Sequence, residues 1–257
     1  MQKVEKPEDL SYVNGVPFVV WCYWEGAPMT GNRLLSFSYL TQNIGVPVCL
    51  ITPENLSLFI KSEHPLPIAY NNLSIVHRSD YIRAYLLHHY GGGWHDIKAT
   101  KVSYAKAWNI FENPSVWIIG KAESKNGAAR TYDNTGRYMP DHYDRLIAVP
   151  SWVGRPNTPL SQAILTGIES IIEKKSDLLR LHPSIHPRDK KIASKFLIKR
   201  LFQWIKFISQ GRSTKYPLEW TLFGNIFHPC ILLYHSHVST ALPVDELKNA
   251  GIYHRKN

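Results

Sequence analysis

The segment that decides the fold is residues 78–98, which read RSDYIRAYLLHHYGGGWHDIK. Its first half predicts a helix over 79–90, because Ser79 is a good N-cap and apolar residues follow at helical spacing. The three glycines from Gly91 end that helix and permit a tight turn. From Trp94 the chain becomes extended and carries Asp96. The segment therefore predicts a helix that passes through a glycine turn into an extended stretch bearing a carboxylate.

Short apolar runs alternate with helical patterns on both sides of this segment. Strands are expected at residues 16–21, 46–51, 116–120, 146–149 and 230–234. Helices are expected at residues 33–43, 53–60, 159–173 and 190–208. The alternation favours an α/β fold with a largely parallel sheet. Because no repeat or low-complexity linker interrupts the chain, residues 1–257 are interpreted as a single domain with a C-terminal helical addition.

Composition excludes several classes of protein. The chain has 257 residues, 44% of them hydrophobic and only 19% charged, which excludes intrinsic disorder. It has no apolar run long enough to cross a bilayer, and residues 1–9 lack the apolar region of a secretory signal. Cys22, Cys49 and Cys230 are odd in number and far apart, which excludes a disulfide framework and a CxxC zinc site. A cytoplasmic protein with reduced thiols is expected.

The positive charge is concentrated in one segment. The formal net charge is +10, and residues 188–215 hold nine basic side chains against the single acid Asp189. The expected helix over 190–208 combines a basic stripe with a broad apolar side, which is typical of an interfacial helix on an anionic membrane. An ordinary core-facing helix with a solvated basic face is the alternative. Nucleic-acid binding is not expected, because no recognised motif is present and the basic residues stand in this segment alone.

The residue types around the glycine turn suit the binding of a diphosphate. On a helix, Ser79, Asp80 and Arg83 share one face. A carboxylate such as Asp96 can hold a divalent cation that in turn holds a diphosphate, and Arg83 can either meet a phosphate or hold Asp80 in place. Taken singly, these signals also fit a helix cap, a surface ion pair and an ordinary loop. Their joint order is far more specific than any one of them.

This order, Ser-Asp-x-x-Arg followed by Tyr-Gly-Gly-Gly, an aromatic residue and Asp96, resembles the sugar-binding signature of GT-A glycosyltransferases. The similar proteins are family 32 and the capsular polysaccharide synthesis proteins and, more distantly, the clostridial glucosylating toxins. The resemblance implies a GT-A, Rossmann-like nucleotide-sugar-binding fold. It also implies a hexosyltransferase-type enzyme of bacterial surface polysaccharide synthesis, which moves a sugar from a UDP- or GDP-linked donor, with retention, to a glycan or lipid-linked glycan hydroxyl. A cytoplasmic enzyme, peripheral on the inner face of the membrane, would fit that role.

The resemblance also assigns roles to residues. It places Asp96 at the chemistry, with a divalent cation, Mn²⁺ or Mg²⁺, on its carboxylate, and Lys98 stands where the family has a second acid. His235 and His237 would face the same side of a strand end and are candidate further metal ligands. Two solvent-facing histidines in a loop are the alternative. The candidate donor-binding residues are Trp21, Tyr23, Trp24, Ser79, Asp80, Arg83, Gly92 and Gly93. For Trp21 and Trp24, stacking on a nucleobase competes with core packing.

The chain departs from the family pattern at one position. Where the family has Asp-x-Asp, this sequence reads Asp96-Ile97-Lys98, and a protonated lysine cannot ligate a cation. Either Asp96 binds a cation with other ligands, or Lys98 neutralises the diphosphate itself. The alternative to an enzyme is a non-catalytic, transferase-like module that binds nucleotide, glycan or anionic membrane after losing the second acid.

Overall fold

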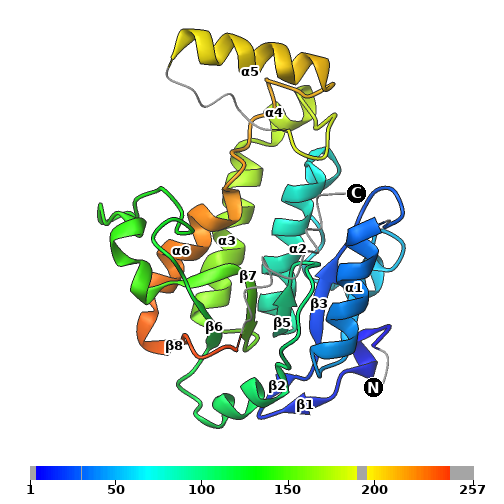
Figure 1. Ribbon diagram of the computed structural model, residues 1–257, viewed down its shortest axis with the longest axis vertical. Helices are drawn as coiled ribbons and strands as arrows, with labels where there is room; N and C mark the ends of the chain where they lie inside the picture. The colour runs from blue at the N-terminus through cyan, green and yellow to red at the C-terminus, as the bar shows by residue number, and fades with distance from the viewer. Residues whose placement is uncertain (1–3, 30, 190–195, 244–257) are drawn as a thin grey trace.

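A mixed six-stranded sheet forms the centre of the molecule in the computed structural model, which describes residues 4–29, 31–189 and 196–243 (Figure 1). β3 runs parallel to both β4 and β5, β7 runs antiparallel to β5 and β6, and β8 runs parallel to β6. The predicted α/β class is confirmed, although the sheet is parallel only in part. In order across the sheet, the strands are β4 (Val48–Ile51), β3 (Val20–Tyr23), β5 (Gly92–His95), β7 (Ile147–Gly154), β6 (Ile118–Ala122) and β8 (Val238–Ser239).

Helices cover both faces of this sheet. The face that carries Trp21 packs against α2 (Ile75–His89), α3 (Pro159–Lys174) and α6 (Leu222–Leu233). The face that carries Val20 and Cys22 packs against α1 (Gly31–Asn43) and the 3-10 helix η4 (Ala105–Glu112). Successive strand residues point to opposite faces, so the unbroken apolar run of β3 supplies both cores. Such runs are typical of a strand that is buried on its two sides.

Most predicted elements are present, with shifted ends. The expected strand at 16–21 is divided between β2 (Val16–Pro17), which pairs with β1 (Tyr12–Val13), and β3. The expected helix at 53–60 is only a short 3-10 helix, η2 (Leu56–Phe59). The predicted strand at 230–234 is wrong, because these residues form the end of α6 and its C-cap. The other short 3-10 helices are Pro7–Asp9, Tyr70–Asn72, Met139–Arg145 and His235–His237.

The start of α2 also differs from the prediction. Ser74, and not Ser79, is the N-cap, and its side chain accepts a hydrogen bond from the backbone N–H of His77. Both serines suit a cap by residue type, but the helix continues one turn further toward the N-terminus. Ser79 therefore lies inside the helix, half-buried.

The C-terminal addition contains the two further helices α4 (Ser176–Leu181) and α5 (Leu197–Ser209). The predicted basic helix over 190–208 is confirmed from Leu197 onward, and its first part, residues 190–195, lies outside the described residues. Among the helices that the structure describes, none is long and apolar enough to cross a membrane.

Candidate functional site

The site lies at the edge of the sheet where the parallel strands end. β3, β4 and β5 run in the same direction, so Tyr23, Ile51 and His95 all reach this edge. Asp96 follows β5 directly, and its backbone N–H donates to the carbonyl oxygen of Pro150 at 2.9 Å. The carboxyl edge of a sheet is the usual ligand-binding position in α/β proteins. The fold therefore places the carboxylate of the quoted segment at the expected end of the sheet.

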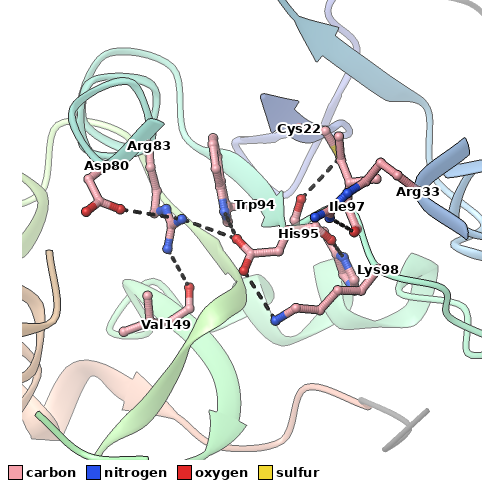
Figure 2. Close-up of polar contacts among 10 residues, drawn as sticks. Cys22, Arg33, Asp80, Arg83, Trp94, His95, Ile97, Lys98 and Val149 are labelled. Carbon is pink, nitrogen blue, oxygen red and sulfur yellow. Dashed lines mark hydrogen bonds and ion pairs between the residues drawn. The ribbon is translucent and has the colours of Figure 1, made fainter. Parts of the chain in front are cut away.

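Asp96 lies between two cationic side chains, those of Arg83 and Lys98, which Figure 2 labels. Its Oδ1 lies 3.2 Å from Nη2 of Arg83 and accepts a hydrogen bond of 3.2 Å from the indole N–H of Trp94. Its Oδ2 lies 3.3 Å from Nζ of Lys98. The side chains of Asp96 and Lys98 remain 31% and 39% exposed, so this pair forms the solvent-facing part of the cluster. Both are accessible to a ligand.

Arg83 forms the buried part of the same cluster. Its Nη1 donates to the carbonyl oxygen of Val149 at 3.2 Å, and its Nη2 lies 3.7 Å from Oδ1 of Asp80. The guanidinium carbon lies 4.7 Å and 4.8 Å from the ring centroids of Trp94 and Phe223. Its buried Nε has no hydrogen-bond partner among the described residues. Arg83 therefore points inward, toward both carboxylates.

The two carboxylates titrate in opposite directions. The pKa of Asp80 is raised to about 6, mainly because the group is buried. The charge of Arg83 lowers this pKa and the nearby charge of Asp96 adds to its rise. Burial also disfavours the charged form of Asp96, but the charges of Lys98 and Arg83 and the Trp94 hydrogen bond outweigh it and lower the pKa of Asp96 to about 2. At neutral pH Asp96 is therefore a fixed anion held by two cations.

The glycine turn allows α2 and β5 to meet the sheet closely. Gly91 has φ +72, and a Cβ at this position would lie 2.6 Å from Cδ of Pro156 and 2.8 Å from the carbonyl oxygen of Gly154. Gly92 and Gly93 lie inside β5, where an added Cβ would meet β3 side chains at 3.1 Å and 3.0 Å. These two glycines are buried in the sheet and do not form a surface for the donor, which corrects the expected role.

A pocket of about 540 Å³ opens at the ends of β3 and β4. The ion pair between Glu25 and Arg78 lies at its wall, and Glu25 also accepts a hydrogen bond of 2.6 Å from the hydroxyl of Tyr23. Tyr23 was expected at the donor and does line this pocket. Sequence reasoning missed Glu25 and Arg78, although Arg78 opens the quoted segment. The lining residues are Tyr23, Glu25, Pro53, Leu56, Ser57, Ile60, Lys61, Ser62, Pro65, Leu66, Tyr70, Asn71 and Arg78.

The structure separates the two tryptophans of the expected base-binding loop. Trp21 is fully buried, and its indole N–H donates to the carbonyl oxygen of Gly91 at 2.7 Å. Trp21 is therefore a core residue that fastens the glycine turn to β3, and nucleobase stacking by it is ruled out in this conformation. Trp24 is half-buried beyond the end of β3, with the guanidinium of Arg33 5.4 Å from its ring centroid. Trp24 stays a candidate for the donor.

His235 and His237 do not join Asp96. Gly92, at the start of β5, is in register with Gly154, and Gly154 is in register with Ile118 at the start of β6. β8 begins beside Ile118, so the histidines just before it lie at the edge of the sheet opposite to Asp96. The ring of His237 stacks on Trp117 at 3.6 Å. The sheet order, which sequence patterns do not reveal, overturns the expected ligand set.

The arrangement at Asp96 bears on the expected divalent cation. Both of its carboxylate oxygens are already paired with cationic or N–H groups. Within residues 4–29, 31–189 and 196–243, no group of three or more His, Cys, Asp or Glu side chains is arranged to hold a metal ion. Mg²⁺ and Mn²⁺ prefer several oxygen ligands. Here Asp96 is the more exposed of the two carboxylates in the cluster and lies between two cations, whereas Asp80 is buried.

Comparison with known proteins bears on this site. Residues 18–142 match the family model described as "Capsular polysaccharide synthesis protein". The resemblance to capsular polysaccharide synthesis proteins is confirmed over these residues. The matched residues include the ends of β3 and β4, the whole of α2, Asp96 and Lys98. Among curated proteins, none matches the chain. A solved structure titled "PaToxG Glycosyltransferase" is 14% identical over 89% of this chain and 88% of that chain, but the TM-score of 0.34 is too low to decide anything about function.

Proposed function

We propose that the protein is a hexosyltransferase-type glycosyltransferase of capsular or other surface polysaccharide synthesis. In this proposal the donor is a UDP- or GDP-linked sugar, the acceptor is a hydroxyl of a glycan or lipid-linked glycan, and the anomeric configuration is retained. The enzyme would act at the inner face of the membrane. One observation carries the proposal: a fixed anion–cation cluster at the carboxyl edge of the sheet, with a pocket at the same edge, inside the segment that matches the capsular polysaccharide family.

In this proposal the pocket binds the nucleoside of the donor, and the Asp96–Lys98 pair acts on its diphosphate. The pocket between Tyr23 and Arg78 has the size and the mixed apolar and polar lining that suit a nucleoside. At the other part, Lys98 faces solvent and is oriented by Asp96. A departing nucleoside diphosphate gains negative charge, which a pre-positioned ammonium group stabilises. In the proposed reaction Lys98 supplies this charge, and Asp96, itself paired with Arg83, holds Lys98 in position.

A divalent cation, Mn²⁺ or Mg²⁺, belongs to the wider family resemblance and enters the proposal as its rival form. In that form, donor phosphates complete a metal shell that begins at Asp96, and Lys98 moves away. In the structure both carboxylate oxygens of Asp96 are paired with cations, which favours the form in which Lys98 stabilises the leaving group. The two forms predict opposite responses to chelation and to replacement of Lys98.

A screen of nucleotide-sugars tests the function. Thermal shift with UDP- and GDP-linked sugars, in EDTA and in Mn²⁺, identifies the donor, and nucleotide release in the presence and absence of acceptor glycans measures turnover. Binding together with release supports the transferase. Binding without release under every condition supports the non-catalytic module instead. No binding to any nucleotide-sugar contradicts the transferase and also a module that binds nucleotide.

Lys98 variants separate the two forms. If Lys98 stabilises the leaving group, Lys98→Ala lowers kcat by about 10²–10³-fold, the usual loss for one such donor. In that case Lys98→Asp should be at least as impaired as Lys98→Ala. If a metal acts instead, Lys98→Asp maintains or raises activity that depends on Mn²⁺. The exposed Lys106 in η4 is a matched control, and Lys106→Ala should leave kcat unchanged.

A further inference from the structure

The helix α5 has an orientation that is unusual for a soluble protein. It lies at one end of the molecule, beyond α4 and away from the sheet (Figure 1). Among its residues, all of which the structure describes from Leu197 to Ser209, Phe207 alone is buried. The large apolar side chains of the helix are 46% to 82% exposed, namely Leu197, Ile198, Leu201, Phe202, Trp204, Ile205 and Ile208.

These exposed apolar side chains form one continuous face. At about 100° per residue they fill an arc of roughly 160° on the helix, and we call this set the apolar arc. Phe207 lies outside the arc, so the helix contacts the body through its polar side and turns its apolar side to solvent. An amphipathic helix of a soluble domain normally does the reverse. The apolar arc is therefore built for a partner outside the molecule.

The charges beside the apolar arc indicate which partner fits. At the same angular spacing, Lys206 borders one margin of the arc and Arg200 the other, with Lys199 next to Lys206. Sequence positions 190–218 contain no acidic residue at all. Long cationic side chains at the margins of an apolar helix face can reach lipid headgroups while the apolar side chains enter the acyl region. A second copy of the same face would instead bring like charges together.

The residues that flank the α5 segment, Asp189 and Ser213, are hydrogen-bonded to each other. Asp189 is fully buried, and its carboxylate accepts hydrogen bonds from the backbone N–H groups of Ile185, His186 and Ser213, at 2.7, 3.0 and 3.0 Å. Asp189 and Ser213 thus meet at one point, and α5 belongs to the segment between them, residues 190–212, which the structure describes from residue 196 onward. We call this segment the excursion. With 13 residues, the helix is about 20 Å long, against about 30 Å for the hydrocarbon core of a bilayer. It is too short to cross and suited to lie flat.

We propose that α5 docks flat on an anionic lipid bilayer, with its apolar arc among the acyl chains and its flanking cations at the headgroups. The inference deepens the proposed function, because it names the surface that would bring the enzyme to a lipid-linked acceptor. Its test needs no sugar donor. Failure of lipid binding leaves the transferase proposal standing, and failure of transfer leaves the lipid proposal standing.

Vesicle binding by the full-length protein tests the proposal. Co-sedimentation compares vesicles of phosphatidylcholine alone with vesicles that contain phosphatidylglycerol. We expect binding to the anionic vesicles, weakened by high salt because the headgroup attraction is screened. Failure to bind anionic vesicles, or equal binding to both kinds at every salt concentration, overturns the proposal.

Two substitutions with the same charge change separate insertion from simple attraction. Gln203→Glu adds one negative charge on the polar side and should weaken binding by about fivefold, the contribution of one charge near the surface. Ile205→Glu adds the same charge inside the apolar arc and should weaken binding by at least about tenfold more, because apolar burial is also lost. Both side chains are exposed, so neither change disturbs folding. Equal effects contradict insertion.

Fluorescence reports the depth of the helix directly. Trp204 is 46% exposed in the apolar arc, so vesicles with brominated acyl chains should quench part of the fluorescence of the wild-type protein. In Trp204→Phe that quenched part should disappear while binding remains. Concentration-dependent self-association without lipid, abolished by Ile205→Glu, would assign the apolar arc to a second copy and reject the lipid proposal.

Discussion

Asp80 is an anion in surroundings that favour its neutral form. Its pKa is raised from 3.8 to about 6, so between these pH values the folded protein binds more protons than the unfolded chain. The free energy of unfolding therefore falls as pH rises through this window. Two pKa units correspond to about 3 kcal/mol, which is the order of the stability that the protein gives up above pH 6 to keep a second carboxylate beside Arg83.

Asp80→Asn removes this cost, because the amide stays neutral at every pH. We expect the variant to be more stable than the wild type by about 1–3 kcal/mol at pH 7.5 and nearly equal to it at about pH 3, below both pKa values of the carboxyl. Urea unfolding at the two pH values measures the difference. Asp177→Asn is the control, since Asp177 is 90% exposed on α4 and should show no such pH dependence. A variant that is less stable at pH 7.5 would show that the pairing with Arg83 outweighs the burial cost.

Arg83→Lys keeps the charge but loses the planar fork. One ammonium group cannot reach Val149, Asp96 and Asp80 together or lie between the rings of Trp94 and Phe223 as the guanidinium does. We expect a loss of about 2 kcal/mol in the free energy of unfolding and about tenfold weaker donor binding, because Lys98 loses part of the support of Asp96. The exposed Arg180 supplies the control Arg180→Lys. Wild-type donor affinity in Arg83→Lys would contradict a positioning role.

Local patterns reveal part of this residue-scale arrangement. The i,i+3 spacing predicts that Asp80 and Arg83 share a face, and the structure confirms that they lie close together and point inward. The contact of Glu25 with Arg78 and the approach of Lys98 to Asp96 depend on tertiary packing and on rotamers. No periodic pattern in the sequence predicts either contact.

At the scale of elements, the turn between α2 and β5 is the critical joint. Gly91 has a positive φ, and an added Cβ would meet the backbone of Pro156 and Gly154 at 2.7 and 2.8 Å. Gly136 also has a positive φ, +80, but has nothing within 4 Å of that position. The two glycines therefore form a matched pair that separates backbone strain from steric contact.

Gly91→Ala should lower the free energy of unfolding by about 2–4 kcal/mol, since it adds both strain and overpacking. Gly136→Ala should lower it by only about 1 kcal/mol, from strain alone. Thermal or urea unfolding compares the two variants directly. Because Asp96 follows β5 directly, we also expect Gly91→Ala to impair donor binding. Equal losses in the two variants would mean that the packing of the turn against β7 contributes little.

Sequence patterns predict helices and strands well where a periodic pattern extends over several turns. They predict poorly where there is only a short apolar run. α1, α2 and α3 are present because their apolar spacing extends over several turns. The run CILLY at 230–234 has five apolar or aromatic residues in succession, which fits a buried strand as well as a buried helix. Here it ends α6, which packs its apolar residues against α3. Tertiary packing decided between the two.

At the scale of the whole molecule, sheet order decides which residues can cooperate. The parallel strands bring Tyr23, Glu25 and Asp96 to one edge, whereas the antiparallel β7 and β6 carry the chain back, so that β8 starts at the opposite edge. His235 and His237 could not be placed from sequence for this reason. The excess positive charge is likewise segregated, because most of it belongs to residues 188–215 and not to the candidate site.

This segregation predicts that the excursion 190–212 is separable from the rest of the fold. Its two ends meet at Asp189, whose Oδ1 accepts from the N–H of Ser213 at 3.0 Å, so a short Gly-Ser linker can replace it without moving the body. Among residues 196–212, the part of the excursion that the structure describes, Phe207 alone is buried. We therefore expect a decrease of only about 1–2 kcal/mol in the free energy of unfolding. Donor binding, measured by thermal shift, should be unchanged, because the pocket and Asp96 lie outside the excursion. Loss of donor binding or of cooperative unfolding would show instead that α5 supports the α/β core.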